Sequence, residues 1–269
     1  MLYDRPKVLS LQHNTMEISA YILTCNSERY IEEILTQLSK FADEVVVLDS
    51  GSTDATLERA ARFPSVSIYH RPFDNFKEQR NYAASLCRND TVFYVDSDEI
   101  PDDTLVNALF AIKAEMTELG GCGYAVSRQW YVMGRRVHSI YPVESPDHVI
   151  RLFDRRYISF DSHSTLVHET LGGQSETRLL DGSLIHRTFH TRQEMKSKLE
   201  QYTTLAAQDL IQRKGKVRRI KVLSNPIAAF VKWYFFKRGF LDGQVGLMTG
   251  CYAYRYTWLK YRKALQMMK

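Results

Sequence analysis

Residues 93–102, FYVDSDEIPD, place four acidic side chains directly behind a run of apolar and aromatic residues. Asp102, with Pro101 before it, suits the first turn of a following helix, because Asp favours the positive end of a helix. Asp96 and Asp98 come too early to cap that helix and would lie at the carboxyl end of a strand, where open α/β sheets place ligands. There they could bind a hard cation that holds phosphate oxygens. The Asp-x-Asp pair alone leaves capping and metal binding both open.

A second acidic segment, DSGSTD (residues 49–54), follows another apolar run. Gly51 would permit a tight turn and Asp54 would cap the next helix. A plain turn with a cap leaves Asp49 unexplained, and an acid at that edge could accept hydrogen bonds from a base or a ribose. The sequence has neither G-x-x-x-x-G-K-[ST] nor G-x-G-x-x-G after its first apolar run, and it lacks the G-x-S-x-G of α/β-hydrolases.

The elements that must position these acids alternate along the first 120 residues. Apolar and β-branched runs predict strands at 18–24, 44–49, 66–70 and 91–96. Apolar residues at helical spacing predict helices at 28–41, 54–62, 77–86 and about 105–119. This alternation predicts an α/β fold in which helices cover a mostly parallel sheet.

The pattern changes after GGCG (residues 120–123). Short strand-like pieces through residue 190 predict an α+β appendage that covers the ligand edge of the sheet. From residue 191 the sequence is helical through Arg213, and a basic, aromatic tail follows.

Charge is unevenly distributed along the chain. The net charge of +5 consists of −8 before Arg213 and +13 from Arg213 onward, where Asp242 is the single acid. The same tail holds 11 of the 32 aromatic residues. This combination is typical of contacts with an anionic membrane or with nucleic acid, but a helical tail with packed aromatics and a solvated basic face fits it equally.

Cysteine usage and hydropathy favour a cytoplasmic protein that is soluble or peripheral to a membrane. The four cysteines form no C-x-x-C pair, and residues 1–14 lack the apolar core of a signal peptide. The longest uncharged run near the C-terminus, residues 243–254, is too short to span a bilayer.

Four segments in order resemble the motifs of inverting glycosyltransferase family 2, namely TCNSERYI (24–31), VVLDSGSTDAT (46–56), KEQRNYA (77–83) and VDSDE (95–99). The second half resembles the WaaE/LgtF-type lipopolysaccharide-core β-glucosyltransferases, through RLFDR (151–155), VHE (167–169), WYFFKRGFLDGQVGL (233–247) and WLKYRK (258–263). The resemblance implies the Rossmann-like GT-A fold of nucleotide-diphospho-sugar transferases. Its catalytic domain would span 17–190, with a donor-binding half at 17–119 and an acceptor-side half at 120–190, followed by a helical basic extension at 191–269.

The same resemblance implies roles for single residues. Asp98 would bind Mn²⁺ or Mg²⁺, and Asp96 would face the ribose or the metal shell. His186 matches a position that could reach the metal, although a lone histidine is more often an ordinary hydrogen-bond partner. Asp49 would contact the uracil, and Arg80 would lie near the base and diphosphate.

The first motif supplies the remaining expected donor contacts, Thr24, Asn26 and Glu28. Relatives often carry Glu where this chain has Ser27, which makes Glu28 the expected ribose contact. Glu169 matches the general base, with a surface acid at a strand end as the alternative. His168 would orient Glu169 or the acceptor.

The implied reaction moves glucose from UDP-glucose to a hydroxyl of the lipopolysaccharide inner core, a lipid-linked anionic glycan. A cation would stabilise charge on the leaving UDP while a carboxylate takes the acceptor proton, with inversion at the anomeric carbon. The basic tail would then dock on an anionic membrane, and no nucleic acid is expected as a partner.

Three alternatives remain at this stage. Another family 2 activity would act on a polyprenyl phosphate, a polysaccharide or a peptide. A nucleotidyltransferase of the same fold should open with a Gly-rich basic loop, which SAYILTCNSER lacks. A nucleic-acid-binding module would explain the tail but not the acids at three strand ends.

Overall fold

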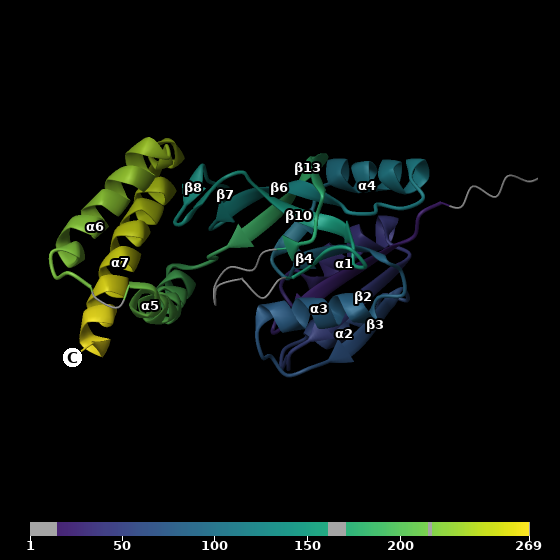
Figure 1. Ribbon diagram of the computed structural model, residues 1–269, viewed down its shortest axis with the longest axis horizontal. Coiled ribbons are helices and arrows are strands. Elements are labelled where there is room, and N and C mark those ends of the chain that lie inside the picture. Colours follow the sequence, from purple (N-terminus) through teal and green to yellow (C-terminus); the bar gives the residue numbers. More distant parts are fainter. Residues whose placement is uncertain (1–14, 161–170, 215–216, 269) are drawn as a thin grey trace, which may run out of the picture.

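The structure, a computed structural model, describes residues 15–160, 171–214 and 217–268. A sheet with its covering helices forms one part of the molecule, and helices α5 to α7 form the other (Figure 1). The strands are β1 (Ile18–Thr24), β2 (Glu44–Asp49), β3 (Val66–His70), β4 (Thr91–Asp96), β5 (Glu99–Pro101), β6 (Cys122–Val132), β7 (Arg135–Arg136), β8 (Ser139–Ile140), β9 (Val143–Glu144), β10 (Asp147–Asp154), β11 (Ser159–Phe160), β12 (Leu171–Gly172) and β13 (Glu176–Thr188). The helices are α1 (Ile31–Phe41), α2 (Thr56–Ala60), α3 (Phe76–Leu86), α4 (Asp103–Glu115), α5 (Arg192–Lys214), α6 (Lys221–Val231) and α7 (Gly243–Met267), with a π-helical turn, η1 (Lys232–Phe236), and a 3₁₀ turn, η2 (Gly239–Asp242), before α7.

Strands β1 to β4 form the parallel part of the sheet, and their bounds are those predicted from the apolar runs. Alternate residues of β2 face opposite sides. Val45 and Val47 pack into a core with α1, α2 and α4, whereas Val46 and Leu48 pack into a second core with α3. Because helices cover both faces, these strands are apolar at almost every position.

The segment 120–190 differs from the predicted appendage. Its strands β10, β6 and β13 continue the same sheet, whose order is β3-β2-β1-β4-β10-β6-β13-β5. β10 is antiparallel to both β4 and β6, and β13 is parallel to β6. Unpaired N–H and C=O groups would otherwise lie along the exposed edge of β4, and β10 satisfies them. The end of β4 therefore lies beside strands from a distant part of the chain.

The helical extension packs against the end of β6 and against β8, at one end of the sheet (Figure 1). α7 packs along both α5 and α6. Asp242, in the turn before α7, accepts a hydrogen bond from the backbone N–H of His138 at 2.8 Å, which connects this turn to the segment between β7 and β8. The turn is tight, because a Cβ at Gly246 would lie 1.7 Å from the carbonyl oxygen of Gly239. Within the described ranges, no helix is apolar enough over a sufficient length to cross a membrane.

Candidate active site

The carboxyl ends of three parallel strands bring the predicted donor residues together. In the register of the sheet, Thr24 of β1 lies opposite Asp49 of β2, and Leu23 lies opposite Asp96 of β4. The Thr24 hydroxyl donates a hydrogen bond to Asp49 Oδ1 at 3.0 Å. The prediction that these residues share one edge of the sheet is confirmed.

The loops that follow β1 and β2 are hydrogen-bonded to each other. Asn26, in the left-handed backbone conformation with φ of 52°, accepts at Oδ1 from the backbone N–H of Thr53 at 2.8 Å. Glu28 Oε2 accepts from the backbone N–H of Ala55 at 3.1 Å. Both side chains border a cavity of about 310 Å³, so they shape the loops and also face the site.

Asp49 holds the turn after β2. Its carboxylate accepts from the backbone N–H groups of Gly51 at 2.9 Å and Ser52 at 2.8 Å, and also from the Ser52 hydroxyl. Burial raises the pKa of Asp49, but the hydrogen bonds from Ser52, Gly51 and Thr24 outweigh it and leave this pKa below its ordinary value. Asp49 is therefore an ionised anchor of the loop, and its contact with a uracil stays a prediction.

The acidic cluster after β4 contains a helix cap, as predicted, and a carboxylate that pairs with an arginine. Asp102 caps α4, because its Oδ1 accepts from the backbone N–H of Leu105 at 2.8 Å. Asp96 instead pairs with Arg80 of α3, whose Nη2 lies 2.7 Å from Asp96 Oδ1. Burial raises the pKa of Asp96, but Arg80 and then Arg151 hold it below its ordinary value despite the nearby charge of Glu99.

Glu99 is the buried centre of the site, fully shielded from solvent. Its carboxylate accepts from Arg151 Nη2 at 2.5 and 2.6 Å, from Arg128 Nη1 at 3.1 Å, and from the backbone N–H of Asp96 at 3.1 Å. His186 Nδ1 lies 3.2 Å from Glu99 Oε1. Burial alone would raise the pKa of Glu99, yet Arg151, then His186 and Arg128, place it well below its ordinary value. The carboxylate is thus ionised and fixes three cationic or imidazole groups around it.

Asp98 and His186 lie next to each other in the wall of a cavity, with Asp98 Oδ2 3.4 Å from His186 Nε2. Asp98 is 31% exposed, and no arginine pairs with it among the residues that the structure describes. Its pKa is raised, because burial and the charges of Asp96 and Glu99 outweigh the favourable effect of His186. Burial lowers the pKa of His186, but the carboxylates of Asp98 and Glu99 raise it above its ordinary value.

This pair fits a divalent cation that completes its shell with phosphate oxygens and water. Mg²⁺ in nucleotide sites is often held by one or two carboxylates together with substrate phosphates. A carboxylate oxygen suits both Mg²⁺ and Mn²⁺, whereas an imidazole nitrogen is typical of the softer first-row metals, so the pair suits Mn²⁺ better than Mg²⁺. In the described ranges no three His, Cys, Asp or Glu side chains converge into a complete protein-only metal cage. The donor set therefore suits a metal that binds together with a substrate.

Two cavities meet at Asp98. One, of about 360 Å³, is lined by Arg80, Asp96, His186 and Trp130 among others, and the second is the loop cavity beside Asn26. Lys198 of α5 lines both cavities. A bound molecule could therefore extend from the β1 and β2 loops across Asp98 toward Arg80, with ammonium and guanidinium groups along its path.

Several residues in or beside the cavity were not predicted from the sequence. Trp130 stacks on His186, with ring centres 4.0 Å apart and planes at 27°, and its indole N–H donates to Asp147 at 2.8 Å. Lys198 and Tyr202 enter the cavity from α5, beyond the boundary predicted at residue 190. Arg151 is the first residue of the RLFDR segment, so the sequence identified its motif but not its partner, Glu99. The other three positions carried no sequence signal.

The predicted base, Glu169, and its neighbour His168 lie outside the described residues. Asp147, another acid of the same half of the chain, is bound to Arg128 Nη2 at 2.5 Å. Asp154 is fully buried and is held by Arg156. Both of these acids are already paired with an arginine, and the assignment of the base to Glu169 stays a prediction.

Comparison with known proteins supports the motif analysis. The family model for glycosyl transferase family 2 matches residues 19–165, more than half of the chain. The lipopolysaccharide core biosynthesis glycosyltransferase LpsC of Rhizobium meliloti (strain 1021) is 28% identical over 252 residues, covering 87% of this chain and 88% of LpsC. An uncharacterised glycosyltransferase of Rickettsia bellii (strain RML369-C) is 25% identical over 246 residues, covering 87% of this chain and 81% of that protein.

A similar architecture occurs in the mannosyltransferase PcManGT from Pyrobaculum calidifontis, solved in complex with GDP-mannose and Mn²⁺. It superposes with a TM-score of 0.53 at 17% sequence identity, covering 94% of this chain and 88% of that chain. This likeness concerns the fold alone, and it confirms the predicted GT-A type of α/β architecture. Since the family model spans all four motif segments and the parallel half of the sheet, the chain belongs to glycosyltransferase family 2.

Proposed function

We propose that this glycosyltransferase moves glucose from UDP-glucose to a hydroxyl of a lipopolysaccharide inner-core acceptor, with inversion, as in the WaaE/LgtF-type branch. The observation that supports the donor part of this proposal is the Asp98–His186 pair, which lies where two cavities meet and is flanked by Arg80 and Lys198. The similarity of this protein to LpsC, which extends along most of both chains, supports the choice of acceptor.

The site residues would act mainly on the diphosphate of the donor. Asp98 and His186 would hold a divalent cation, which supplies positive charge to the leaving diphosphate. Arg80 and Lys198 lie along the same cavity and would bind further phosphate oxygens. Asp96 keeps Arg80 in place through the contact at 2.7 Å, so this guanidinium need not reorganise when the donor arrives.

The acceptor hydroxyl requires a base on the face opposite the leaving group. We assign that proton transfer to Glu169, on the resemblance of the VHE segment. The carboxylates of Asp96 and Glu99 are poor alternatives, because arginine contacts hold their pKa values low. A single base and a single face of attack would give a β-glycoside from an α-linked donor.

A UDP-release assay tests the donor and the metal together. Purified protein would be offered a panel of UDP-sugars and GDP-sugars, with and without Mn²⁺, and with a deacylated inner-core acceptor. We expect release from UDP-glucose that requires both the acceptor and the cation. Preference for a GDP-sugar, or equal release with a polyprenyl phosphate acceptor, would contradict the corresponding part of the proposal.

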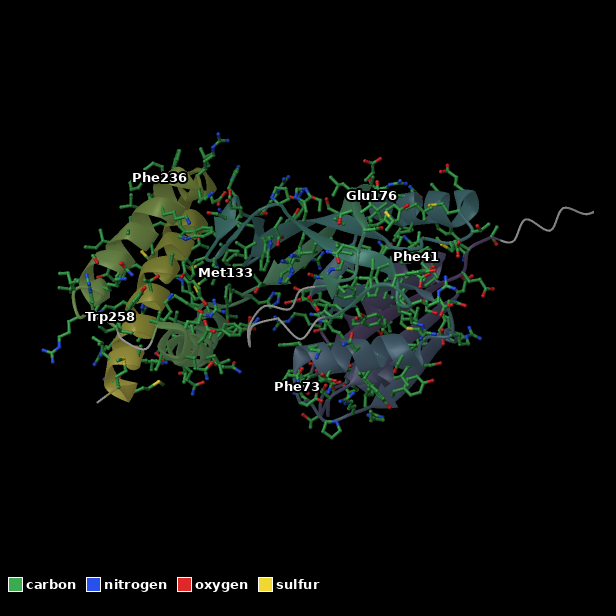
Figure 2. All side chains as sticks on the ribbon, in the orientation of Figure 1. Phe41, Phe73, Met133, Glu176, Phe236 and Trp258 are labelled. Atoms are coloured by element: carbon green, nitrogen blue, oxygen red, sulfur yellow. The ribbon has the colours of Figure 1, made fainter. Side chains whose placement is uncertain are left out.

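The helical extension would place the enzyme on an anionic membrane surface. α6 carries an exposed apolar stripe that includes Leu223, 64% exposed, and Ile227, 58% exposed. Phe236 in η1 is 77% exposed and projects from the end of the extension (Figure 2). The same segment of the chain carries basic residues at Arg218, Arg219, Lys221, Lys232, Lys237 and Arg238. An exposed apolar face beside cationic side chains is typical of elements that lie in the membrane interface.

Co-sedimentation with liposomes tests this placement. Leu223→Glu should weaken binding to phosphatidylglycerol vesicles by about 2 kcal/mol, because a buried leucine side chain is lost from the interface. Phe110→Glu is the matched control, since Phe110 is also exposed (44%) but belongs to α4 in the sheet region. Equal weakening by both variants, or binding to neutral vesicles as tight as to anionic ones, would contradict the membrane role.

A further inference from the structure

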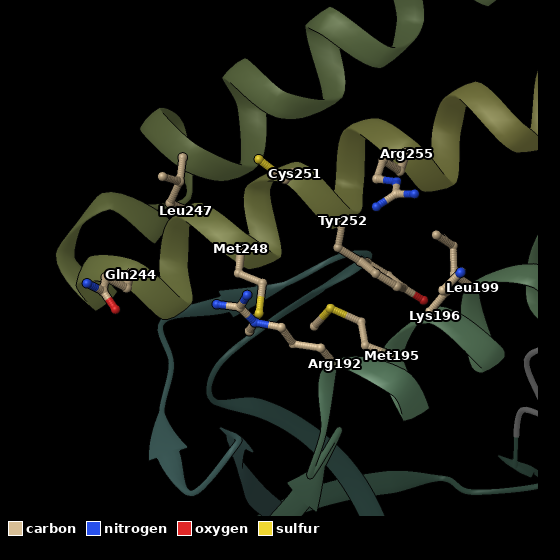
Figure 3. Close-up of a pocket in the computed structure, with 10 residues that line it drawn as sticks. All are labelled: Arg192, Met195, Lys196, Leu199, Gln244, Leu247, Met248, Cys251, Tyr252 and Arg255. Carbon is tan, nitrogen blue, oxygen red and sulfur yellow. The ribbon is translucent and has the colours of Figure 1, made fainter.

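A cavity of about 540 Å³ lies between α5 and α7, apart from the site described above. Figure 3 shows its lining residues, which come from both helices. The walls are apolar and are formed by Met195, Leu199, Leu247, Met248 and Tyr252. The volume lies within the range of roughly 300–1,000 Å³ that is common for small-ligand pockets. Methionine walls adapt to flexible apolar ligands, because the thioether chain is unbranched and polarisable.

Three cationic side chains, Arg192, Lys196 and Arg255, line the same cavity, and no acid among the described residues does. Each of the three is solvent-exposed, and none has an ion pair or side-chain hydrogen bond with another described residue. The nearest acids along α5 are engaged elsewhere. Glu194 binds Arg29 and the backbone N–H of His190, whereas Glu200 binds Lys263. Unbalanced positive charge therefore surrounds an apolar pocket.

We propose that this pocket binds one anionic lipid of the membrane, with an acyl chain between α5 and α7 and the phosphate headgroup at Arg192, Lys196 and Arg255. The three cationic side chains favour an anionic headgroup, and the apolar walls favour an acyl chain. The pocket wall begins at Gln244, soon after the exposed residues Phe240 and Leu241 of the tail. The lipid therefore comes from the same bilayer on which the extension docks.

This inference rests on one part of the proposed function, namely that the helical extension docks on a membrane. The pocket is also separated from the catalytic cavity by α5 itself. Lys198 and Tyr202 of that helix line the catalytic cavity, whereas Lys196 and Leu199 line the lipid pocket. Binding can thus be measured without a donor, a metal or turnover, and its failure would leave the proposed glycosyl transfer untouched.

Cys251 gives a readout inside the pocket, because its thiol is exposed and lines the cavity. The rate of its alkylation by N-ethylmaleimide would be followed by peptide mass spectrometry, with dodecyl phosphate below its micellar concentration as the probe. Mass action predicts that alkylation slows about elevenfold at ten times the dissociation constant. Cys25, also exposed but placed at the loop cavity, is the internal control and should react at an unchanged rate.

Charge variants separate this pocket from the general basic character of the tail. Arg192→Gln/Arg255→Gln should abolish the protection of Cys251. The matched control Arg218→Gln/Arg219→Gln removes the same charge from exposed positions that do not line the pocket, and should keep it. Shortening the probe to hexyl phosphate should weaken binding by up to about fourfold for each methylene that had been buried.

Five results would overturn the proposal. Equal protection by neutral dodecyl maltoside would make the pocket a plain apolar groove, and equal protection by inorganic phosphate would make it a simple anion site. Protection that grows with protein concentration alone, or that follows an acidic peptide as well as dodecyl phosphate, would assign the surface to a protein contact. Loss of protection in both charge variants would show that only the overall charge matters.

Discussion

A substitution of the buried residue Glu99 would test whether its charge holds the site together. Glu99→Gln keeps the shape of the side chain but removes the charge that faces Arg151 and Arg128. Removing one partner of a buried ion pair typically costs 3–5 kcal/mol, because the other charge stays buried without compensation. At roughly 2–4 °C per kcal/mol for a chain of this size, the melting temperature should fall by roughly 6–20 °C.

The pH dependence follows from the low pKa of Glu99 in the folded protein. The unfolded chain has a pKa near the ordinary 4.5, so the stabilisation by Glu99 is complete above that pH. It is lost as the pH falls through the lower, folded pKa. The difference in unfolding free energy between wild type and Glu99→Gln should therefore be constant at neutral pH and shrink below about pH 4.5.

Urea denaturation monitored by circular dichroism at several pH values would measure this difference. Glu58→Gln serves as the control, because Glu58 pairs with Arg62 on the surface, where both side chains are mostly exposed. That pair should be worth at most about 1 kcal/mol. A loss for Glu99→Gln no greater than for Glu58→Gln, or a difference that persists unchanged into acid, would refute the assignment of Glu99 as an ionised anchor.

Three further predictions concern the chemistry and the extension. Asp98→Asn should abolish transfer with little change in melting temperature, and EDTA should silence the wild type; full activity in either case contradicts the metal role. Glu169→Gln should leave UDP binding intact while kcat and kcat/KM fall equally, by about 10²–10⁴-fold, and more than about a tenth of kcat remaining would exclude it as the base. Gly246→Ala should lower the free energy of unfolding by about 1–3 kcal/mol, because its Cβ would meet the carbonyl oxygen of Gly239; an unchanged urea midpoint would argue against that close approach.

The parallel half of the sheet could be predicted from the sequence because its information is local. Continuous apolar runs define strands that are buried on both faces, and helical spacing defines what covers them. Since the carboxyl ends of parallel strands share one edge, the placement of Asp49 and Asp96 at that edge followed from the alternation of elements. The helix cap at Asp102 was equally local.

The arginine contacts could not be predicted, because they depend on pairing between distant strands. Arg151 reaches Glu99 from 52 residues away, on a strand that is antiparallel to β4. The short strand-like segments after residue 120 do not indicate which strands they pair with. Their place in the main sheet was therefore not predicted. Lys198 was placed outside the catalytic domain because a helix looks the same in sequence whether or not it lines a cavity. The turn that occupies Asp49 was likewise hidden, since a carboxylate at a strand end can bind a ligand or its own loop.

The balance between acidic and basic side chains around the cavity has a consequence for how a metal ion and a nucleotide would bind. Four carboxylates and four cationic side chains gather around the site, namely Asp96, Asp98, Glu99, Asp147, Arg80, Arg128, Arg151 and Lys198, so their formal charges cancel. A dication that entered alone would leave the cavity with excess positive charge, and a diphosphate alone with excess negative charge. Entering together, they would preserve neutrality in a region of low dielectric constant, where uncompensated charge is costly. Each should therefore increase the affinity for the other by the same factor, so that the site behaves as a receptor for the metal–nucleotide complex rather than for either component.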